Sequence, residues 1–168
     1  MRSWTMKCLF LALALVLVAP ISAAAQVTPG KLGVGLSFLS DEGTGVGFTV
    51  DYSAPVRSFS NNRTLGWVGD FSFHHDDGVD VITLQGGVRF AGQFGTNPDL
   101  TWHAQGILGL LHASADGEGE SRFIFSPGAG IDYAFAERTA LRAQLDFPLG
   151  DDVSAVRFWF GISQKVGQ

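Results

Sequence analysis

The most constraining feature of this chain is an alternation of apolar and polar residues that recurs along most of its length. Residues 32–38 read LGVGLSF and residues 71–73 read FSF, so that every second side chain is apolar. Because successive side chains of a β-strand point to opposite faces, this pattern predicts strands whose two faces differ in polarity. Beyond Gln26 no comparable run has helical periodicity. We therefore predict an all-β fold.

The alternating segments are separated by turn residues at the spacing of a sandwich or a barrel. Eight strands are predicted, over residues 31–39, 44–53, 64–74, 79–90, 100–112, 122–135, 139–147 and 154–163. Each is about as long as a tilted strand that crosses a membrane, and bacterial membrane barrels have even strand numbers. Pro127 cannot donate a ladder hydrogen bond, and it predicts a bulge or bend in the sixth strand.

The apolar face of these strands carries no charged residue, whereas the opposite face carries charges of both signs. The charged residues are Lys31, Asp51, Asp70, Arg89, Arg122, Asp132, Arg142, Asp146 and Arg157. Five positive and four negative charges nearly cancel, as expected where ions face a closed lumen and must pair with one another. A soluble lipocalin-like barrel with these charges in water would not require that balance. We therefore predict an eight-stranded transmembrane β-barrel whose lumen holds an ion-pair network.

Aromatic residues fall near the two ends of the predicted strands. One rim would carry Phe38, Phe73, Phe123, Phe125 and Phe147, and the other would carry Tyr52, Phe90, Trp102, Tyr133 and Phe135. Membrane barrels place aromatic girdles at their two interfaces, whereas a soluble sandwich would gather its aromatic residues in one core. The placement favours the membrane barrel.

The first residues have the three parts of a secretory signal peptide. Arg2 and Lys7 precede an apolar stretch over residues 8–19, and small residues end at Ala25. That stretch is shorter than the roughly 20 residues of a spanning helix. We predict a cleaved signal over residues 1–25 and one barrel domain over residues 26–168.

Composition excludes some function classes. The only cysteine, Cys8, lies in the predicted signal, so the mature chain is expected to have neither disulfides nor thiol chemistry. The formal net charge of -5 argues against nucleic acid as a partner. The pattern indicates no cofactor.

The stretch from Ser126 to Phe147, SPGAGIDYAFAERTALRAQLDF, resembles a hairpin that recurs in small OmpA-like outer-membrane β-barrel proteins. The matching residues are Gly128, Gly130, Tyr133, the turn 136–138, Leu141, Arg142, Ala143 and Asp146. The resemblance implies an antiparallel up-and-down barrel in the outer membrane of a Gram-negative cell, with both termini in the periplasm. It also implies outer-membrane lipid and lipopolysaccharide as surroundings, and the barrel-assembly machinery and periplasmic chaperones as partners. The chain departs from the family in ending without a terminal aromatic and in its long periplasmic segments, 54–63 and 91–99.

With the N-terminus in the periplasm, the outer connections would carry nine acidic residues and no basic one: Asp41, Glu42, Asp76, Asp77, Asp116, Glu118, Glu120, Asp151 and Asp152. Within the stretch FSFHHDDG, Asp77-Gly78 is a tight-turn signal. His74, Asp76, Asp77, Asp116, Glu118 and Glu120 could make weak contacts to cations. A hairpin tip holds such ligands loosely, so we expect a solvated polar turn and no metal centre.

Two features leave functional alternatives open. His112 and Ser114 share a face, as in the His-x-Ser pair of outer-membrane lipid A deacylases, but no third catalytic group is evident from spacing. The lumen charges would serve a narrow gated channel if they moved apart, although an eight-stranded barrel is only wide enough for its own side chains. We expect no enzyme but a monomeric barrel with a structural or surface-interaction role and a closed, charged lumen. The alternatives are the channel, a lipid-modifying enzyme and a soluble periplasmic binding barrel.

Overall fold

A computed structural model describes residues 29–41, 43–60, 62–115 and 118–167. The long strands are β1 (Gly30–Ser40), β2 (Thr44–Phe59), β3 (Arg63–Asp76), β4 (Val79–Phe94), β5 (Asn97–Ala115), β6 (Glu118–Ala134), β7 (Thr139–Asp146) and β10 (Val156–Val166). The two-residue strands β8 (Leu149–Gly150) and β9 (Val153–Ser154) form a small hairpin between β7 and β10. The predicted signal peptide, residues 1–25, lies outside the described residues. No helix in the described part of the chain is long and apolar enough to span a bilayer.

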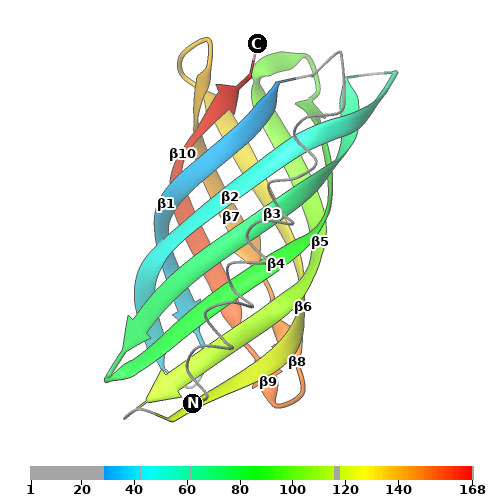
Figure 1. Cartoon of the computed structure of the whole chain (residues 1–168). Coiled ribbons are helices and arrows are strands. Elements are labelled where there is room, and N and C mark those ends of the chain that lie inside the picture. The colour runs from blue at the N-terminus through cyan, green and yellow to red at the C-terminus, as the bar shows by residue number, and fades with distance from the viewer. Residues whose placement is uncertain (1–28, 42, 61, 116–117, 168) are drawn as a thin grey trace.

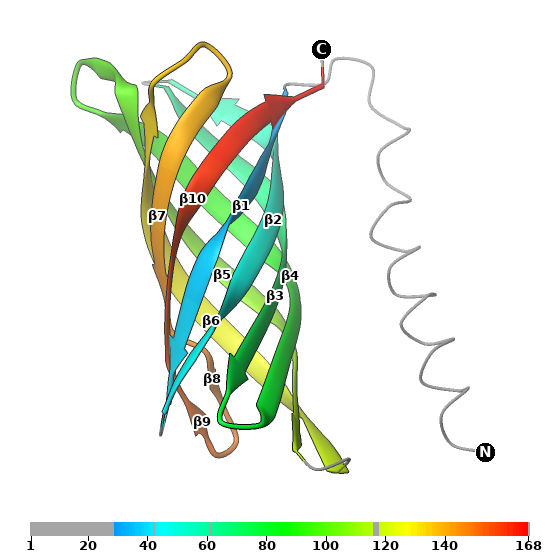
Figure 2. The same cartoon turned by 90° about the vertical axis from the view of Figure 1, so that its left-hand side faces the viewer.

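The eight long strands form one closed antiparallel barrel (Figure 1). Each strand from β1 to β6 pairs with the next, β7 pairs with β10, and β10 pairs with β1. The last pairing closes the sheet, with Gly30 opposite Val166 and Ser40 opposite Val156. β1 begins and β10 ends at one end of the barrel, called here the termini end; the other is called the far end (Figure 2). The predicted fold class is confirmed.

Two strands run further than the sequence suggests. We expected long connections over residues 54–63 and 91–99, and this expectation is wrong, because β2 continues to Phe59 and β4 to Phe94. The register shifts between Pro55 and Arg57 in the β2–β3 pairing and after Gln93 in the β4–β5 pairing. An extra residue in one strand interrupts the period of two, so the alternation hides the continuation of the strand.

The turn after β3 has the predicted form. Asp76 pairs with Val79, which leaves Asp77 and Gly78 as a two-residue loop. Their φ angles are 41° and 86°, and a type I′ turn requires positive φ at both positions. Glycine adopts this region without strain, and aspartate tolerates it better than most residues. The tight-turn prediction is confirmed.

Side-chain exposure separates the two faces of the sheet as the alternation predicts. On the outside, Leu36, Val88 and Leu108 are 55%, 57% and 50% exposed, whereas Asp51 and Arg157 inside are fully buried. An apolar outer surface around a polar interior suits a lipid environment and is the reverse of a soluble binding barrel. The lipocalin-like alternative is therefore excluded.

Aromatic side chains contact one another on the outer face near the termini end. The rings of Tyr52 and Trp67 lie 5.2 Å apart, and those of Phe90 and Trp102 lie 5.6 Å apart. Tyrosine and tryptophan side chains have an apolar ring and one polar group, which suits the boundary between lipid tails and water. Part of the expected girdle at this rim is thus formed by direct ring contacts.

β7 is the shortest of the eight long strands, and its end changes the wall of the barrel. Its last pair with β6 joins Asp146 to Gly128, after which the backbone N–H of Phe147 donates to the carbonyl of Pro127 (2.9 Å). In an antiparallel sheet the backbone nitrogen and carbonyl of one residue point to the same neighbouring strand. The nitrogen of Pro127, which carries no hydrogen, therefore faces the edge where β7 ends. The β5–β6 register continues unbroken past Pro127, so the expected bulge is absent there. Beyond this point the edge of β6 that faced β7 pairs with β8, through Ile124 and Phe125, while its other edge stays paired with β5.

Candidate functional site

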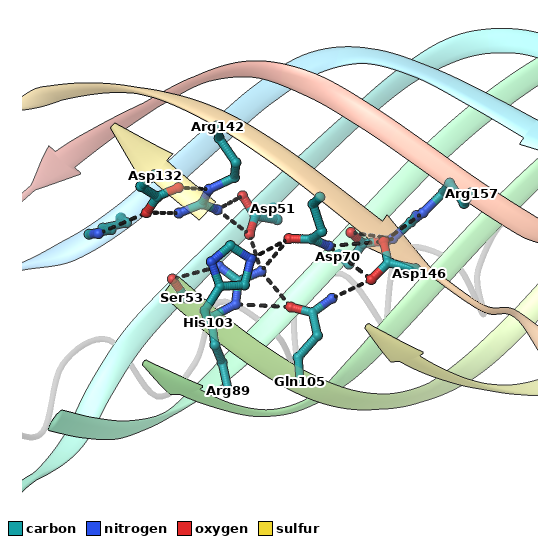
Figure 3. Close-up of polar contacts among 12 residues, drawn as sticks. Asp51, Ser53, Asp70, Arg89, His103, Gln105, Asp132, Arg142, Asp146 and Arg157 are labelled. Carbon is teal, nitrogen blue, oxygen red and sulfur yellow. Dashed lines mark hydrogen bonds and ion pairs between the residues drawn. The ribbon is translucent and has the colours of Figure 1, made fainter. Parts of the chain in front are cut away.

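The lumen holds a connected network of charged side chains, and Arg142 lies within it (Figure 3). Its Nη1 donates to both carboxylate oxygens of Asp51, at 2.9 and 2.7 Å. Its Nε and Nη2 donate to the two oxygens of Asp132, at 2.5 and 3.0 Å. Lys31 Nζ also donates to Asp132, at 2.9 Å. The guanidinium stands 5.8 Å from the ring centroid of Trp159, so one side chain binds two carboxylates and stacks over an indole.

Arg89 extends the network through neutral side chains. Its Nη2 lies 2.6 Å from Asp51 Oδ2, and its Nε and Nη2 donate to Gln105 Oε1 at 2.9 and 2.6 Å. The Gln105 amide in turn donates to Asp146 at 3.0 Å. His103 Nε2 lies 2.8 Å from the side-chain oxygen of Gln144, another residue whose amide donates to Asp146. The two glutamines therefore connect the arginine and carboxylate groups.

Arg157 anchors the part of the network nearer the far end. Its Nη1 and Nη2 donate to the two oxygens of Asp70, at 2.7 and 3.0 Å. Its Nε and Nη2 donate to Asp146, at 3.1 and 2.8 Å. All three side chains have no exposed surface. A two-pronged arginine–carboxylate pair is the strongest common form of a charged hydrogen bond.

The network is formally neutral. The cations are Lys31, Arg89, Arg142 and Arg157, and the anions are Asp51, Asp70, Asp132 and Asp146. Each of the eight long strands contributes at least one charged or hydrogen-bonding side chain. Removing ions from water is costly unless each has a partner, and here four charges of each sign meet.

Glycines on the inner face leave space for these side chains. A Cβ added at Gly33 would collide with Asp51 Oδ1 and approach Trp159, and one added at Gly128 would collide with Asp146 Oδ1. The mixture of charge and glycine on one face, which the sequence shows, thus has a steric cause. Bulky charged groups fit inside a narrow barrel where facing positions lack side chains.

Arg122 was expected in the network but does not join it. Its Nη2 donates to Glu120 at 2.9 Å and its Nη1 to the backbone carbonyl of Asp152 at 3.0 Å, and the side chain is 32% exposed. Arg122 and Asp132 are on the same strand and face, but ten residues of strand span about 33 Å. Two charged residues on the same face of a strand therefore do not join one network when they lie at different depths in the barrel.

The residues proposed for weak cation contacts do not come together as a metal centre. Asp76 lines a cavity, Asp77 forms the turn, Glu118 and Glu120 begin β6, and Asp116 lies outside the described residues. Within the described ranges, no group of three or more His, Cys, Asp and Glu side chains could hold a metal ion.

His74 is not part of the solvated polar turn that we expected. Its side chain is fully buried inside the barrel, with Nε2 2.8 Å from the hydroxyl oxygen of Ser37 on β1. Only the two residues that follow Asp76 form the exposed turn. His74 belongs to the inner face by the period of two, because Ser72 and Asp70 precede it on that face.

Two cavities lie at opposite ends of the lumen. The cavity at the termini end, of about 290 Å³, is lined by Lys31, Arg89, Arg142 and Lys165 among others. The cavity at the far end, here called the vestibule, has a volume of about 390 Å³. The inward-facing apolar residues Val68, Ile107, Ile124 and Trp159 are at most 1% exposed. Together with the charged network they occupy the interior between the two cavities.

Gln144, like Ser53, is a member of the network that the sequence analysis missed. It lies two residues from both Arg142 and Asp146, so the period of two places it on their face. Its amide group has one acceptor and two donors, which here contact His103 and Asp146. A search restricted to charged residues overlooks such a link.

His112 and Ser114 do not form the pair that the enzyme alternative needs. The Nδ1 of His112 lies 2.9 Å from the hydroxyl oxygen of Ser121 on the neighbouring strand. Among the described residues no carboxylate lies within ion-pair distance of His112. A serine nucleophile needs a base that is itself oriented by a third group, and no carboxylate of the described residues orients His112 in this way.

The family model described as "Outer membrane protein beta-barrel domain" matches residues 11–158. No protein among the curated sequences matches the chain.

Three similar crystal structures are eight-stranded outer-membrane barrels. Neisserial surface protein A has 17% identity and a TM-score of 0.54, over 84% of this chain and 99% of that chain. Ail, the attachment invasion locus protein of Yersinia pestis, has 18% identity and a TM-score of 0.52, over 81% and 95%. The N-terminal β-barrel domain of Pseudomonas aeruginosa OprF has 17% identity and a TM-score of 0.54, over 83% and 98%. At this identity the structures share the fold, and the family match covers most of the chain: the protein belongs to the outer-membrane β-barrel domain family, among the OmpA-like barrels.

Proposed function

We propose that this protein is a non-conducting barrel with a structural or surface-interaction role in the outer membrane. The observation that carries the proposal is the neutral ion-pair network, in which Asp51, Arg142 and Arg157 have at most 1% exposed side chain. An eight-stranded barrel has no spare interior width, and here the interior holds paired ions and large apolar groups. A lumen filled in this way offers water and ions no continuous path.

The family implies an outer-membrane location. We place the termini end in the periplasm and the far end outside the cell, after a signal peptide at residues 1–25 has been removed. In this orientation the acidic connections at the far end would stand in water outside the cell. Insertion would involve the barrel-assembly machinery and periplasmic chaperones. The apolar outer face, which lipid and the lipid part of lipopolysaccharide can cover, favours a monomer.

The charges at the far end do not suit the binding of a polyanion. Ail of Yersinia pestis is described in complex with sucrose octasulfate, a heparin analogue and a polyanion. The far end of the present chain carries Asp41, Asp76, Glu120 and Asp152 around its vestibule. Like charges oppose binding of a polyanion there. We therefore do not extend that ligand class to this protein.

Single-channel recording in planar bilayers tests the closed lumen. We expect purified wild-type protein to give no discrete current steps, while a porin incorporated under the same conditions gives them. The folded state is checked first by electrophoretic mobility with and without boiling, because folded membrane barrels migrate differently from boiled ones. Regular steps from a sample shown to be folded would overturn the proposal and favour the gated channel.

Expression in a Gram-negative host tests the proposed absence of an enzyme. The mass of lipid A should be the same with the wild-type protein and with a His112→Ala variant. A mass change that is present with the wild type and lost in the variant would show lipid-modifying activity. Equal membrane levels of the two proteins are the control.

A further inference from the structure

The vestibule at the far end combines an apolar wall with acidic groups. Leu111, Ile124 and Val153 form a buried cluster, with Val81 and Ala113 packed against it. The wall of the cavity includes Leu111, Val153, Val81 and Leu39. The volume of about 390 Å³ falls within the range of ligand pockets, roughly 300 to 1,000 Å³. The apolar part is therefore large enough to receive the hydrocarbon body of a small molecule.

The charged part of the vestibule is strongly acidic. Asp41, Asp76, Glu120 and Asp152 line it together with a single cation, Arg122. Arg122 is already paired with Glu120, and it donates to the backbone of Asp152. In the described part of the chain no basic side chain lies within ion-pair distance of the carboxylates of Asp41, Asp76 or Asp152. Four carboxylates and one guanidinium leave a formal charge of -3.

A buried polar atom at the wall points independently to a ligand. His74 lines the vestibule, is fully buried, and has an Nδ1 atom with no hydrogen-bond partner. Its Nε2 contacts the hydroxyl of Ser37. If Nε2–H donates to Ser37, the lone pair of Nδ1 is left as an acceptor. Buried polar groups normally have partners, and an acceptor beside an acidic cavity suits a ligand that donates hydrogen bonds.

We propose that the vestibule binds a small organic cation: a protonated amine that carries an alkyl or aryl body. The ammonium group would lie among Asp41, Asp76 and Nδ1 of His74, and the hydrocarbon body would contact Leu111 and Val153. A bare metal ion fits poorly, because it would leave the apolar wall unused and the described residues offer no metal-ligand group. An anion is opposed by the net charge. This binding role goes beyond the proposed closed barrel and does not depend on it.

Methyl NMR of the protein in nanodiscs of zwitterionic lipid locates binding. The probes are 4-phenylbutylamine, its uncharged analogue 4-phenylbutanol and its anionic analogue 4-phenylbutyrate. We expect the amine to shift the methyl signals of Leu39, Leu111 and Val153 in a saturable manner, with weaker binding of the alcohol and none of the acid. Leu84, on the lipid face, is the internal control. Shifts confined to Leu84 and other lipid-facing methyls, or equal affinity for amine and alcohol, would overturn the proposal.

A pair of double variants tests the role of charge. Asp41→Asn with Asp76→Asn should weaken amine binding about tenfold or more, since the ammonium group loses the exposed carboxylate of Asp41 and the half-buried carboxylate of Asp76. Asp77→Asn with Asp151→Asn removes the same charge next to the vestibule without touching its wall, and the affinity should stay within about twofold. Equal weakening in both would show that overall surface charge, and not the vestibule, attracts the amine. Unchanged affinity in the first variant would also refute the site. Binding and conductance are separate measurements, so either proposal can fail alone.

Discussion

Truncation of Arg142 to alanine should destabilise the folded barrel by about 4 kcal/mol. Arg142 makes four hydrogen bonds to Asp51 and Asp132, and its side chain is 1% exposed. Breaking one buried ion pair by removal of a partner costs about 3 to 5 kcal/mol, because the other charge stays buried. Here two carboxylates are affected, but Asp51 keeps Arg89 at 2.6 Å and Asp132 keeps Lys31 at 2.9 Å. We therefore expect the middle of that range, about a thousandfold in the unfolding equilibrium.

Urea titration in lipid vesicles, followed by tryptophan fluorescence, measures this loss. Arg122→Ala is the matched control: it removes the same charge from a solvent-accessible pair outside the network and should cost far less than Arg142→Ala. Arg142→Lys keeps the charge but loses the two-pronged hydrogen bonds of the guanidinium, so its stability should lie between those of the wild type and the alanine variant. Combining Arg142→Ala with Asp51→Asn should cost less than the sum of the two single changes. Equal losses for Arg142→Ala and Arg122→Ala would refute the reasoning.

Two further pairs of variants test the faces and the space inside the barrel. Leu84→Arg puts a charge on the lipid side and should lower the free energy of unfolding by about 2 to 4 kcal/mol. Gln85→Arg places the charge in the lumen opposite Asp70 and should cost less. Equal losses of stability in vesicle titrations would show that the faces are wrongly assigned. Gly33→Ala should destabilise by about 1 to 3 kcal/mol, because its methyl group displaces the network. Gly69→Ala has no neighbour within 4 Å at the new methyl and should be neutral or slightly stabilising by the same titration; a matching loss at both positions would contradict the steric argument.

The faces of the barrel could be predicted because they depend only on the period of two. Lys31, Asp51 and Arg157 were assigned to the lumen from their positions in alternating segments, and all three lie in the network. The apolar residues on the other face, such as Leu36 and Leu108, are about half exposed. A strand with one lipid-facing side allows no other register, since a shift of one residue would exchange the two faces.

Depth in the barrel could not be predicted in the same way. Arg122 has the right face but lies toward the far end, and its partners are Glu120 on the same strand and the backbone of Asp152 in the turn between β8 and β9. His74 was placed at the outer end of a predicted strand and counted among possible cation contacts, although its face is that of Asp70 and the strand continues to Asp76. Strand ends and bulges depend on cross-strand pairing, which a single sequence does not reveal.

The vestibule shows the same limit. Its wall combines residues from β1, β3, β4, β5, β6 and the β8–β9 hairpin, which are distant in sequence. The sequence analysis expected acidic outer connections, and four of these acids line one cavity. Nothing in the alternation indicates that Val153 joins Leu111 and Ile124 in one buried cluster. A cavity arises from the arrangement of several strands and has no local pattern.

The links across the lumen have a consequence for how this protein reaches the membrane. Lys31 contacts Asp132, Asp51 contacts Arg142, and Asp70 contacts Arg157, so each link joins the first half of the chain to the second, over 87 to 101 residues. A hairpin that entered lipid alone would carry these ions without their partners, at a cost of several kcal/mol for each ion. Insertion one hairpin at a time is therefore unfavourable. Partly assembled forms must keep their inner faces in water until the strands have gathered, and the barrel should enter the bilayer and close its seam in one concerted step.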